Sequence, residues 1–469
     1  MLFSSLTFLT LFLPAFLAIY FLIPARLIRF KNVTLLVFSL FFYAIGEPIW
    51  VLLLVFTGLW DYFVGLLIAR SQKKWQAKAL LILTLCVNIG LLCTFKYSAS
   101  IFRLFGAEGG EGGGSSLSLP IGISFYTFQA MSYIIDLYKG HIKPQRDPVA
   151  LMSYVAMFPQ LLSGPIVRYA DVKEKFSQRP VTLAGFSSGI TRFAAGLGKK
   201  VIFANHAGGV ATELLSAAPG AMTTAGVWFG AVMFMFQVYF DFSGYSDMAI
   251  GLAKMIGFDF KENFDHPYTA KSITDFWRRW HISLSTWFRD YVYLPLSSAL
   301  VKRKWKMAPI YIVASLAVWL LTGLWHGGSI NFLIWGLFNC VMLILERFVL
   351  LGLLQKIPVF IGRLYSLLII LIAWLIFYYT DLSALAAAGA TLIGLSGSLT
   401  NHDTNSLFLA NIWILPVLAL FSTKLPSALF QKLKSRIPAV EPVYNAALLG
   451  LSFALMVGQS FNPFLYFRF

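Results

Sequence analysis

Hydrophobic stretches recur from one end of the chain to the other, and short loops rich in lysine and arginine separate them. Most stretches are about 17–25 residues long, the length that an α-helix needs to cross the hydrocarbon core of a bilayer. The sequence lacks the ten-residue alternation of apolar and polar positions that is typical of membrane β-strands. The pattern therefore predicts an all-α fold, a polytopic membrane-embedded bundle of helices.

The hydropathy pattern places about 11–12 spans, of which we draw twelve. The segments are 3–23, 33–45, 48–69, 79–95, 119–138, 201–217, 223–251, 307–325, 330–347, 364–380, 407–423 and 443–460. The first segment has no basic residue before it and is followed by Arg26, Arg29 and Lys31. We therefore expect an uncleaved span whose N-terminus lies outside the cytoplasm. Twelve crossings return the C-terminus to that same side.

Two further apolar segments, 149–167 and 281–300, have basic clusters on both flanks. Because basic loops favour the cytoplasmic side, each segment starts and ends on that side, and we expect re-entrant or interfacial helices beside a cytoplasm-facing cavity. The glycine-rich segment 106–118 is predicted to be a flexible extracytoplasmic loop. We expect a single domain over residues 1–469, with a catalytic core region at 119–347.

Composition narrows the class of partner. Hydrophobic residues make up 58% of the chain and charged residues only 12%, although the formal net charge is +17. The basic residues lie in loops between spans, so orientation in a lipid bilayer explains them, and no nucleic-acid partner is expected. The sequence has no Walker A, GxSxG or HExxH motif and no paired cysteines, and it predicts no metal site.

Two histidines stand in unusual surroundings. His326 follows an apolar run in "GLWHGG", where a neutral imidazole can act as a general base and the glycines would let a substrate approach. A histidine that is merely hydrogen-bonded at a helix end is the alternative. The second motif, "RRWHISLSTWFRD", contains Arg278, Arg279, His281, Arg289 and Asp290. It predicts either an anion-binding mouth, suited to the phosphate of an acyl carrier, or a basic anchor with interfacial tryptophans Trp277, Trp280 and Trp287.

A third group of polar residues lies in the apolar run 236–251. On a helix, Tyr239, Ser243 and Asp247 share one face, and Asp241 and Tyr245 lie on a neighbouring face. This spacing suggests a polar lining within the membrane, and the glycine at 244 suggests local unwinding. Capping of a helix end by aspartate and serine is the alternative.

Several motifs together resemble one known family. They are "LPIGISFYTFQAMSYIIDLYKG" (119–140), "FPQLLSGPIVRYADV" (158–172), "QVYFDFSGYSDMAIG" (237–251), "FWRRWHISLSTWFRDYVYLPL" (276–296), "TGLWHGGSINFLIWG" (322–336) and "NPFLYFRF" (462–469). They are similar to motifs of the membrane-bound O-acyltransferases, in particular the bacterial branch that acetylates alginate or peptidoglycan.

The resemblance implies a helical bundle with a tunnel and the transfer of an acetyl group. The donor would be acetyl-CoA from the cytoplasm, with no bound cofactor. The acceptor would be an extracytoplasmic polysaccharide, reached through a partner resembling an SGNH hydrolase, in a bacterial cytoplasmic membrane. In the family the histidine of "GLWHG" is essential, which corresponds to His326, and the role of the histidine matching His281 is less settled.

The resulting hypothesis has His326 as general base on the acceptor hydroxyl, with Trp325 and Asn331 as tunnel or oxyanion groups. Basic loops place His281 toward the inner side, so a donor entering beside it would project its thioester toward His326. A covalent acyl-enzyme on Tyr239 or Ser243 is the variant. A transporter or exporter that moves a polymer or acyl group without chemistry is the alternative function, because intramembrane charges also serve transport.

Overall fold

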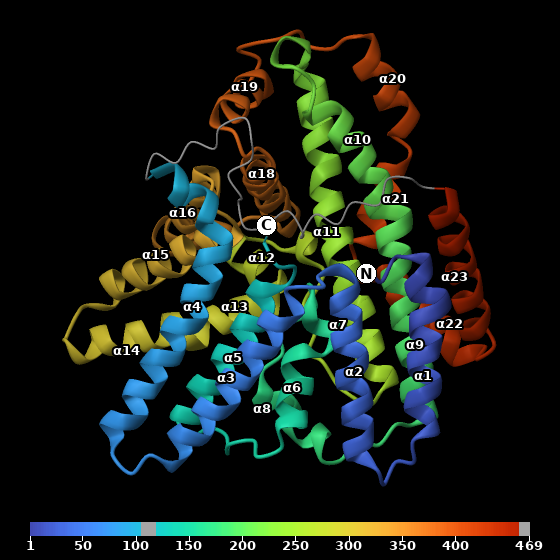
Figure 1. Ribbon diagram of the computed structural model, residues 1–469. Helices are drawn as coiled ribbons and strands as arrows, with labels where there is room; N and C mark the ends of the chain where they lie inside the picture. The colour runs from blue at the N-terminus through green and yellow to red at the C-terminus, as the bar shows by residue number, and fades with distance from the viewer. Residues whose placement is uncertain (105–118, 459–469) are drawn as a thin grey trace. The chain divides into compact units, whose positions relative to one another are not determined.

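The structure is a computed structural model that describes residues 1–104 and 119–458. The predicted loop at 106–118 and the motif at 462–469 lie outside these residues. Within them the fold is helical, without a β-strand and with one isolated bridge between Thr223 and Ser398 (Figure 1). The contacts divide the chain into two compact units, which are described in turn. The division describes how the helices pack, and a single domain over residues 1–469 stays a prediction.

The first unit comprises residues 1–193 and 245–261. Its helices are η1 (Phe8–Phe12), α1 (Leu13–Leu22), α2 (Ile28–Gly46), α3 (Val51–Arg70), α4 (Lys74–Leu104), α5 (Ile123–Tyr138), α6 (Pro148–Ala156), α7 (Phe158–Leu161), α8 (Tyr169–Val172), η2 (Lys173–Phe176) and most of α9 (Leu183–Gly198). Aromatic residues form its packing centre, where Phe158 contacts the rings of Phe12, Phe16 and Phe42. The unit also holds the last turns of α11 (Thr224–Met255).

The second unit comprises residues 194–244 and 262–469, as far as they are described. Before the last span it contains η3 (Lys199–Ala204), α10 (Asn205–Leu215), η4 (Pro219–Ala221), most of α11, η5 (Pro267–Thr269), α12 (Ile273–Arg279), α13 (Ile282–Phe288), η6 (Arg289–Tyr293), α14 (Leu294–Lys302), α15 (Met307–His326), α16 (Ile330–Leu345), η7 (Glu346–Leu350), α17 (Leu351–Leu354), α18 (Val359–Tyr378), α19 (Leu382–Leu392), α20 (His402–Asn411), α21 (Ile414–Phe421) and α22 (Leu425–Arg436). The last helix is α23 (Val440–Gly458).

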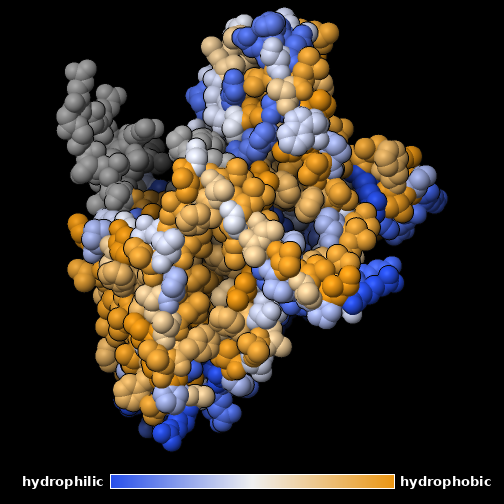
Figure 2. Space-filling model, turned by 90° about the vertical axis from the view of Figure 1, so that its right-hand side faces the viewer, coloured by the Kyte–Doolittle hydropathy of each residue, from blue (hydrophilic) through white to orange (hydrophobic). Residues whose placement is uncertain are grey.

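The predicted membrane spans all fall on helices. In the part of the chain that is described, eight helices are long and apolar enough to cross a membrane: α2, α3, α4, α11, α15, α16 with its extension, α18 and α23. Helices α20 and α21 would make a ninth span, bent by 53° at the break between them. The remaining predicted spans correspond to shorter helices, at 8–22, 123–138 and 199–215. Hydrophobic residues cover most of the face drawn in Figure 2, as expected for a surface in contact with lipid.

The two segments predicted to be re-entrant or interfacial differ in structure. Residues 149–167 form α6 and α7, which are separated at Met157, and α6 begins at Pro148 with the Asp147 side chain capping the N–H of Val149. Residues 281–300 form α13, η6 and α14. These three elements follow one another without a break from Ile282 to Lys302. Neither segment is among the helices long and apolar enough to cross a membrane, and their re-entrant or interfacial placement stays a prediction.

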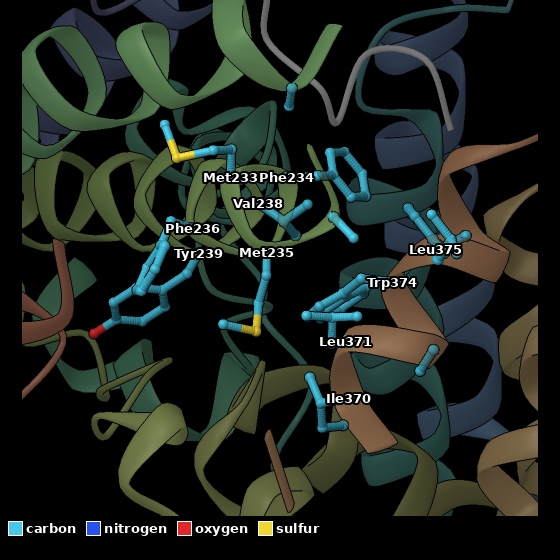
Figure 3. Packing of buried hydrophobic residues seen from close by; sticks show 14 of the residues in the cluster. Met233, Phe234, Met235, Phe236, Val238, Tyr239, Ile370, Leu371, Trp374 and Leu375 are labelled. Atoms are coloured by element: carbon cyan, nitrogen blue, oxygen red, sulfur yellow. The ribbon is translucent and has the colours of Figure 1, made fainter. Parts of the chain in front are cut away.

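The core of the second unit lies between α11 and α18. Buried side chains of Met235, Phe236 and Val238 on α11 belong to one cluster with Leu371 and Trp374 on α18. Figure 3 shows Val238 and Met235 on the side of α11 that faces Trp374 and Leu371, whereas Phe236 points away from them. The same contact holds the wall of the cavity described next, because Val238 and Trp374 both line it.

Candidate active site

A cavity of about 340 Å³ opens within the second unit. Its walls come from α11, α12, α13, η6, α15, α16 and α18 and are largely aromatic, with Phe234, Trp277, Trp280, Phe288, Trp319, Trp335, Trp374 and Phe377. Its ionisable side chains include Asp241, Arg278, His281, Arg289 and His326. An apolar cavity with a few convergent polar groups is the usual form of a site for a small ligand.

His326 is the last residue of α15 and is only 5% exposed. Its ring centroid lies 4.8 Å from that of Trp325 and 5.0 Å from those of Trp335 and Phe377. All three rings meet the imidazole edge to face, an arrangement that restrains its orientation. The cavity therefore contains a buried imidazole whose plane is set by packing.

Two glycines beside His326, Gly323 and Gly327, serve packing; that Gly328 admits substrate stays a prediction. A Cβ on Gly327 would lie 2.7 Å from the ring of Phe332, and a Cβ on Gly323 would lie 2.5 Å from the Phe332 carbonyl oxygen. Real Cβ atoms do not approach that closely, so both positions make room for Phe332 on α16. The glycines thus allow α15 and α16 to pack tightly behind His326.

His281 also lines this cavity and is 3% exposed. It sits at the break between α12 and α13 with φ of 43° and ψ of 55°, a left-handed conformation that costs a non-glycine residue about 1–2 kcal/mol. Burial lowers the pKa of His281 well below its usual value, because the charged imidazolium is poorly solvated there. The imidazole is therefore neutral at physiological pH.

Asn263 holds the turn that carries His281. The Asn263 backbone carbonyl accepts a bond from the N–H of Ile282 at 2.9 Å, and its side-chain oxygen accepts from the N–H and Oγ of Ser283 at 3.2 and 2.9 Å. The same oxygen lies 3.1 Å from Nδ1 of His281. These bonds offset the strain of the left-handed residue and fix the ring.

The arginines of the predicted anion-binding mouth divide into two groups. Arg278 and Arg289 line the cavity, and Arg289 also forms an ion pair with Asp290 at 2.6 Å. Arg279 is not part of the lining; its guanidinium pairs with Asp275 at 2.8 Å and with Asp265 at 3.5 Å. Arg279 thus braces the segment that carries His281.

The interpretation of the three tryptophans as interfacial anchors is wrong for this motif. Trp280 and Trp287 are 3% and 4% exposed, and Trp277 and Trp280 line the cavity. Trp280 stacks on Phe276, with ring centroids 5.5 Å apart. Aromatic rings suit both a membrane interface and a ligand cavity, so the residue type did not distinguish between them.

The polar run at 236–251 does not form one continuous lining. Of its five predicted site residues only Asp241 lines the cavity, and its carboxylate forms a buried ion pair with Lys200 at 2.6 Å. Tyr239 and Ser243 are buried beside it, whereas Tyr245 and Asp247 belong to the first unit, where Asp247 pairs with Arg192 at 2.6 Å.

Helix α11 is continuous through Gly244, which contradicts the predicted unwinding. A Cβ on Gly244 would lie 2.7 Å from the carbonyl oxygen of Gly196, so the glycine instead permits a close approach of two helices.

The remaining two predicted residues, Trp325 and Asn331, lie outside the cavity wall and pack near His326. Trp325 is 6% exposed, and its ring lies within 4.8 Å of the His326 ring and 6.2 Å of the His281 ring, between centroids. Asn331 is fully buried, and its amide lies 3.4 Å from the Ile376 carbonyl, a long hydrogen bond between α16 and α18. Neither residue is part of the cavity wall.

Three functional candidates escaped the sequence analysis: Asn263, Lys200 and Glu346. Glu346 is 2% exposed and its carboxylate accepts the N–H groups of Ile273 and Thr274, at the start of α12, at 2.5 and 2.8 Å. A glutamate and a lysine at the ends of apolar runs look like ordinary loop charges. Their burial is the only sign of a special role, and burial is not visible in one sequence.

Comparison with known proteins identifies the class. Residues 145–388 match the membrane-bound O-acyltransferase family. The chain is 35% identical to the probable alginate O-acetylase AlgI of Azotobacter vinelandii and 38% identical to that of Pseudomonas putida, in each case over the full length of both proteins. It is 29% identical to the peptidoglycan O-acetyltransferase of Helicobacter pylori, over all of this chain and 98% of that one. The protein belongs to the membrane-bound O-acyltransferase family and is a multi-pass membrane O-acyltransferase.

Proposed function

We propose that the protein takes an acetyl group from cytoplasmic acetyl-CoA and passes it to a hydroxyl acceptor for the O-acetylation of an extracytoplasmic polysaccharide. The observation that carries the proposal is that His326 and His281, from separate sequence motifs, line the same aromatic cavity. Relatives that span the whole chain are named for the acetylation of alginate and of peptidoglycan, which supports a polysaccharide as acceptor.

The proposed mechanism is direct acyl transfer. The imidazole of His326 takes the proton of the acceptor hydroxyl while the oxygen attacks the thioester carbonyl. The tetrahedral intermediate then expels the thiolate, which receives that proton from the imidazolium, so that an ester and a free thiol leave. The aromatic walls exclude water, which would otherwise compete as the acyl acceptor.

The donor enters on the side of Arg278 and Arg289 in this proposal. Both guanidiniums line the cavity together with His281. Guanidinium groups suit the phosphates of coenzyme A, which are anions that accept paired hydrogen bonds. The thioester end would then extend among the aromatic residues toward His326.

The proposed setting is the bacterial cytoplasmic membrane, with both termini outside the cytoplasm. The spacing of basic loops supports this orientation. The cavity is lined by helices of the membrane-embedded bundle, so the immediate acceptor hydroxyl is proposed to be a serine of a soluble partner resembling an SGNH hydrolase. That partner would then pass the acetyl group on to the polymer.

A covalent acyl-enzyme on Tyr239 or Ser243 has less support than direct transfer. Neither side chain is part of the cavity wall, although both are buried on the same helix as Asp241. After incubation of the purified protein with donor alone, we expect no acetylated peptide containing either residue by mass spectrometry. An acetyl group trapped on one of them would establish the two-step route.

The decisive test of function is the release of free coenzyme A. Purified protein in detergent is mixed with acetyl-CoA, with or without an oligosaccharide acceptor and the partner, and the free thiol is followed in time. Acceptor-dependent thiol release, matched by ester formation, is expected. A transporter would move substrate across reconstituted vesicles without releasing thiol, and that result would reject the proposal.

A further inference from the structure

The hydrogen bonds around Asn263 determine the protonation pattern of His281. Asn263 is fully buried in the loop after α11, eighteen positions before the histidine. One atom of its side-chain amide lies close to three groups: the backbone N–H of Ser283, the hydroxyl of Ser283 and Nδ1 of His281. Whether that atom is the amide oxygen or the amide nitrogen decides whether Nδ1 of His281 donates or accepts a hydrogen bond.

The backbone N–H settles the orientation of the amide. Oxygen and nitrogen of an asparagine side chain are assigned from their hydrogen-bond partners, and a backbone N–H can only donate. Since the Ser283 N–H points at this atom from 3.2 Å, the atom is the acceptor, Oδ1. The flipped amide would place two donors against each other in a buried site.

The tautomer of His281 follows from the same geometry. Nδ1 lies 3.1 Å from an oxygen that only accepts, and the Ser283 hydroxyl, which is 3.4 Å from Nδ1, donates over the shorter distance of 2.9 Å to that same oxygen. Nδ1 therefore carries the proton and donates it to Asn263 in a hydrogen bond. In a neutral imidazole the lone pair is then on Nε2. Because burial favours the neutral ring, His281 presents a hydrogen-bond acceptor on Nε2.

The charges around His281 are balanced or oppose its protonation. Asp241 on α11 is neutralised by Lys200, and Arg278 on α12 and Arg289 on η6 are cations at the same cavity. From α15 the ionisable neighbours in the cavity wall are His326 and Tyr311, and from η6 Tyr293. The Asn263 side chain accepts a hydrogen bond from Nδ1–H without placing a negative charge beside the ring. An aspartate at this position would add that charge.

We infer that Asn263 is a positioning residue that holds His281 in the Nδ1–H tautomer, so that Nε2 accepts a hydrogen bond from the acceptor hydroxyl in the cavity. This inference rests on the proposed acyl transfer. It assigns His281 the task of orienting the hydroxyl, while His326 takes the proton. The lone pair on Nε2 is lost whenever His281 becomes protonated.

The test compares Asn263→Asp with Asn263→Ala and a matched control, Ser283→Ala. The aspartate keeps an acceptor at Nδ1 but stabilises the imidazolium, so the acid limb of the rate against pH should move upward by about one to three pH units. Activity lost at neutral pH should return at higher pH. The alanine variant should lower kcat by about ten- to a hundredfold without that shift.

The control separates positioning from stability. Ser283→Ala removes a hydroxyl that donates to the same Asn263 oxygen at 2.9 Å and lies 3.4 Å from Nδ1 of His281. It leaves the bond between Nδ1 and Asn263 in place and adds no charge, so it should lower the melting temperature without moving the acid limb of the pH profile. An Asn263→Asp enzyme that is folded by size-exclusion chromatography and has a wild-type pH profile would overturn the inference.

The tautomer of His281 can also be determined by a measurement that does not depend on enzyme activity. Solid-state NMR of protein labelled with ¹⁵N-histidine, with His281→Gln to assign the signal, should show a neutral ring protonated at Nδ1. A ring protonated at Nε2 would refute the inference and leave the acyl-transfer proposal intact. The expected tautomer in a protein that releases no thiol would instead reject the proposed function alone.

Discussion

The carboxylate of Glu346 and the first N–H groups of α12 form a hydrogen-bonded clamp, and its removal should lower both stability and transfer rate. The carboxylate accepts three hydrogen bonds, from the N–H of Ile273 at 2.5 Å, the N–H of Thr274 at 2.8 Å and the Thr274 hydroxyl at 2.7 Å. The first N–H groups of a helix have no partner within it, and a negative charge there also favours the helix dipole. The clamp therefore anchors the helix that carries Trp277 and Arg278 into the cavity wall.

Removing the carboxylate should cost stability and rate together. Glu346→Ala leaves two N–H groups without their acceptor in a buried site, at about 1–3 kcal/mol each, or about 2–6 kcal/mol in all. Glu346→Gln retains one acceptor oxygen and should lose about 1–3 kcal/mol. Both variants should have a lower transfer rate, because α12 is no longer held against η7.

The assay is a thermal melt of detergent-purified protein, followed by initial rates of transfer below the melting temperature. The melting temperature should fall in the order wild type, Glu346→Gln, Glu346→Ala. Glu213→Ala, which changes an exposed glutamate on α10, is the matched control and should behave like wild type. A Glu346→Ala protein with wild-type melting temperature and rate would refute the reasoning.

Two further predictions concern packing and buried charge. Lys200→Met or Asp241→Asn alone should destabilise the protein by about 3–5 kcal/mol, since each removes one partner of a buried ion pair. In a thermal double-mutant cycle, the double variant should recover most of that loss. Losses that simply add would show that the two charges are not coupled. Gly323→Ala should lower the melting temperature, because its Cβ would lie 2.5 Å from the Phe332 carbonyl oxygen, whereas Gly352→Ala, with nothing within 4 Å, should be neutral or slightly stabilising; similar melting temperatures for the two variants would contradict the packing argument.

The helices could be predicted from the sequence because the bilayer fixes their length. Each predicted span contains enough apolar residues to be recognised without knowledge of its neighbours. Basic residues on both flanks also set the segments 149–167 and 281–300 apart from the predicted spans, and neither is among the helices long and apolar enough to cross a membrane. What hydropathy does not contain is which faces of the helices meet.

The sequence predicted several residues of the site, but not how they are arranged in space. His281 and His326 were both identified, but their position in one cavity depends on the turn at His281 and on the packing of α15 against α16. Helical spacing placed Asp241 and Asp247 in one polar lining, yet each has its own basic partner in a different unit. Asn263 was missed because its role depends on a contact across eighteen positions that no local pattern reveals.

The most direct test of the account is acyl transfer by a His326→Ala variant. The purified variant, with its fold checked by thermal melt, is assayed for ester formation and thiol release beside wild type and His402→Ala, which changes an exposed histidine of α20. The account predicts a loss of about a hundredfold or more for His326→Ala and a wild-type rate for His402→Ala. A folded His326→Ala enzyme that transfers acetyl groups at a rate near that of wild type would contradict the central claim.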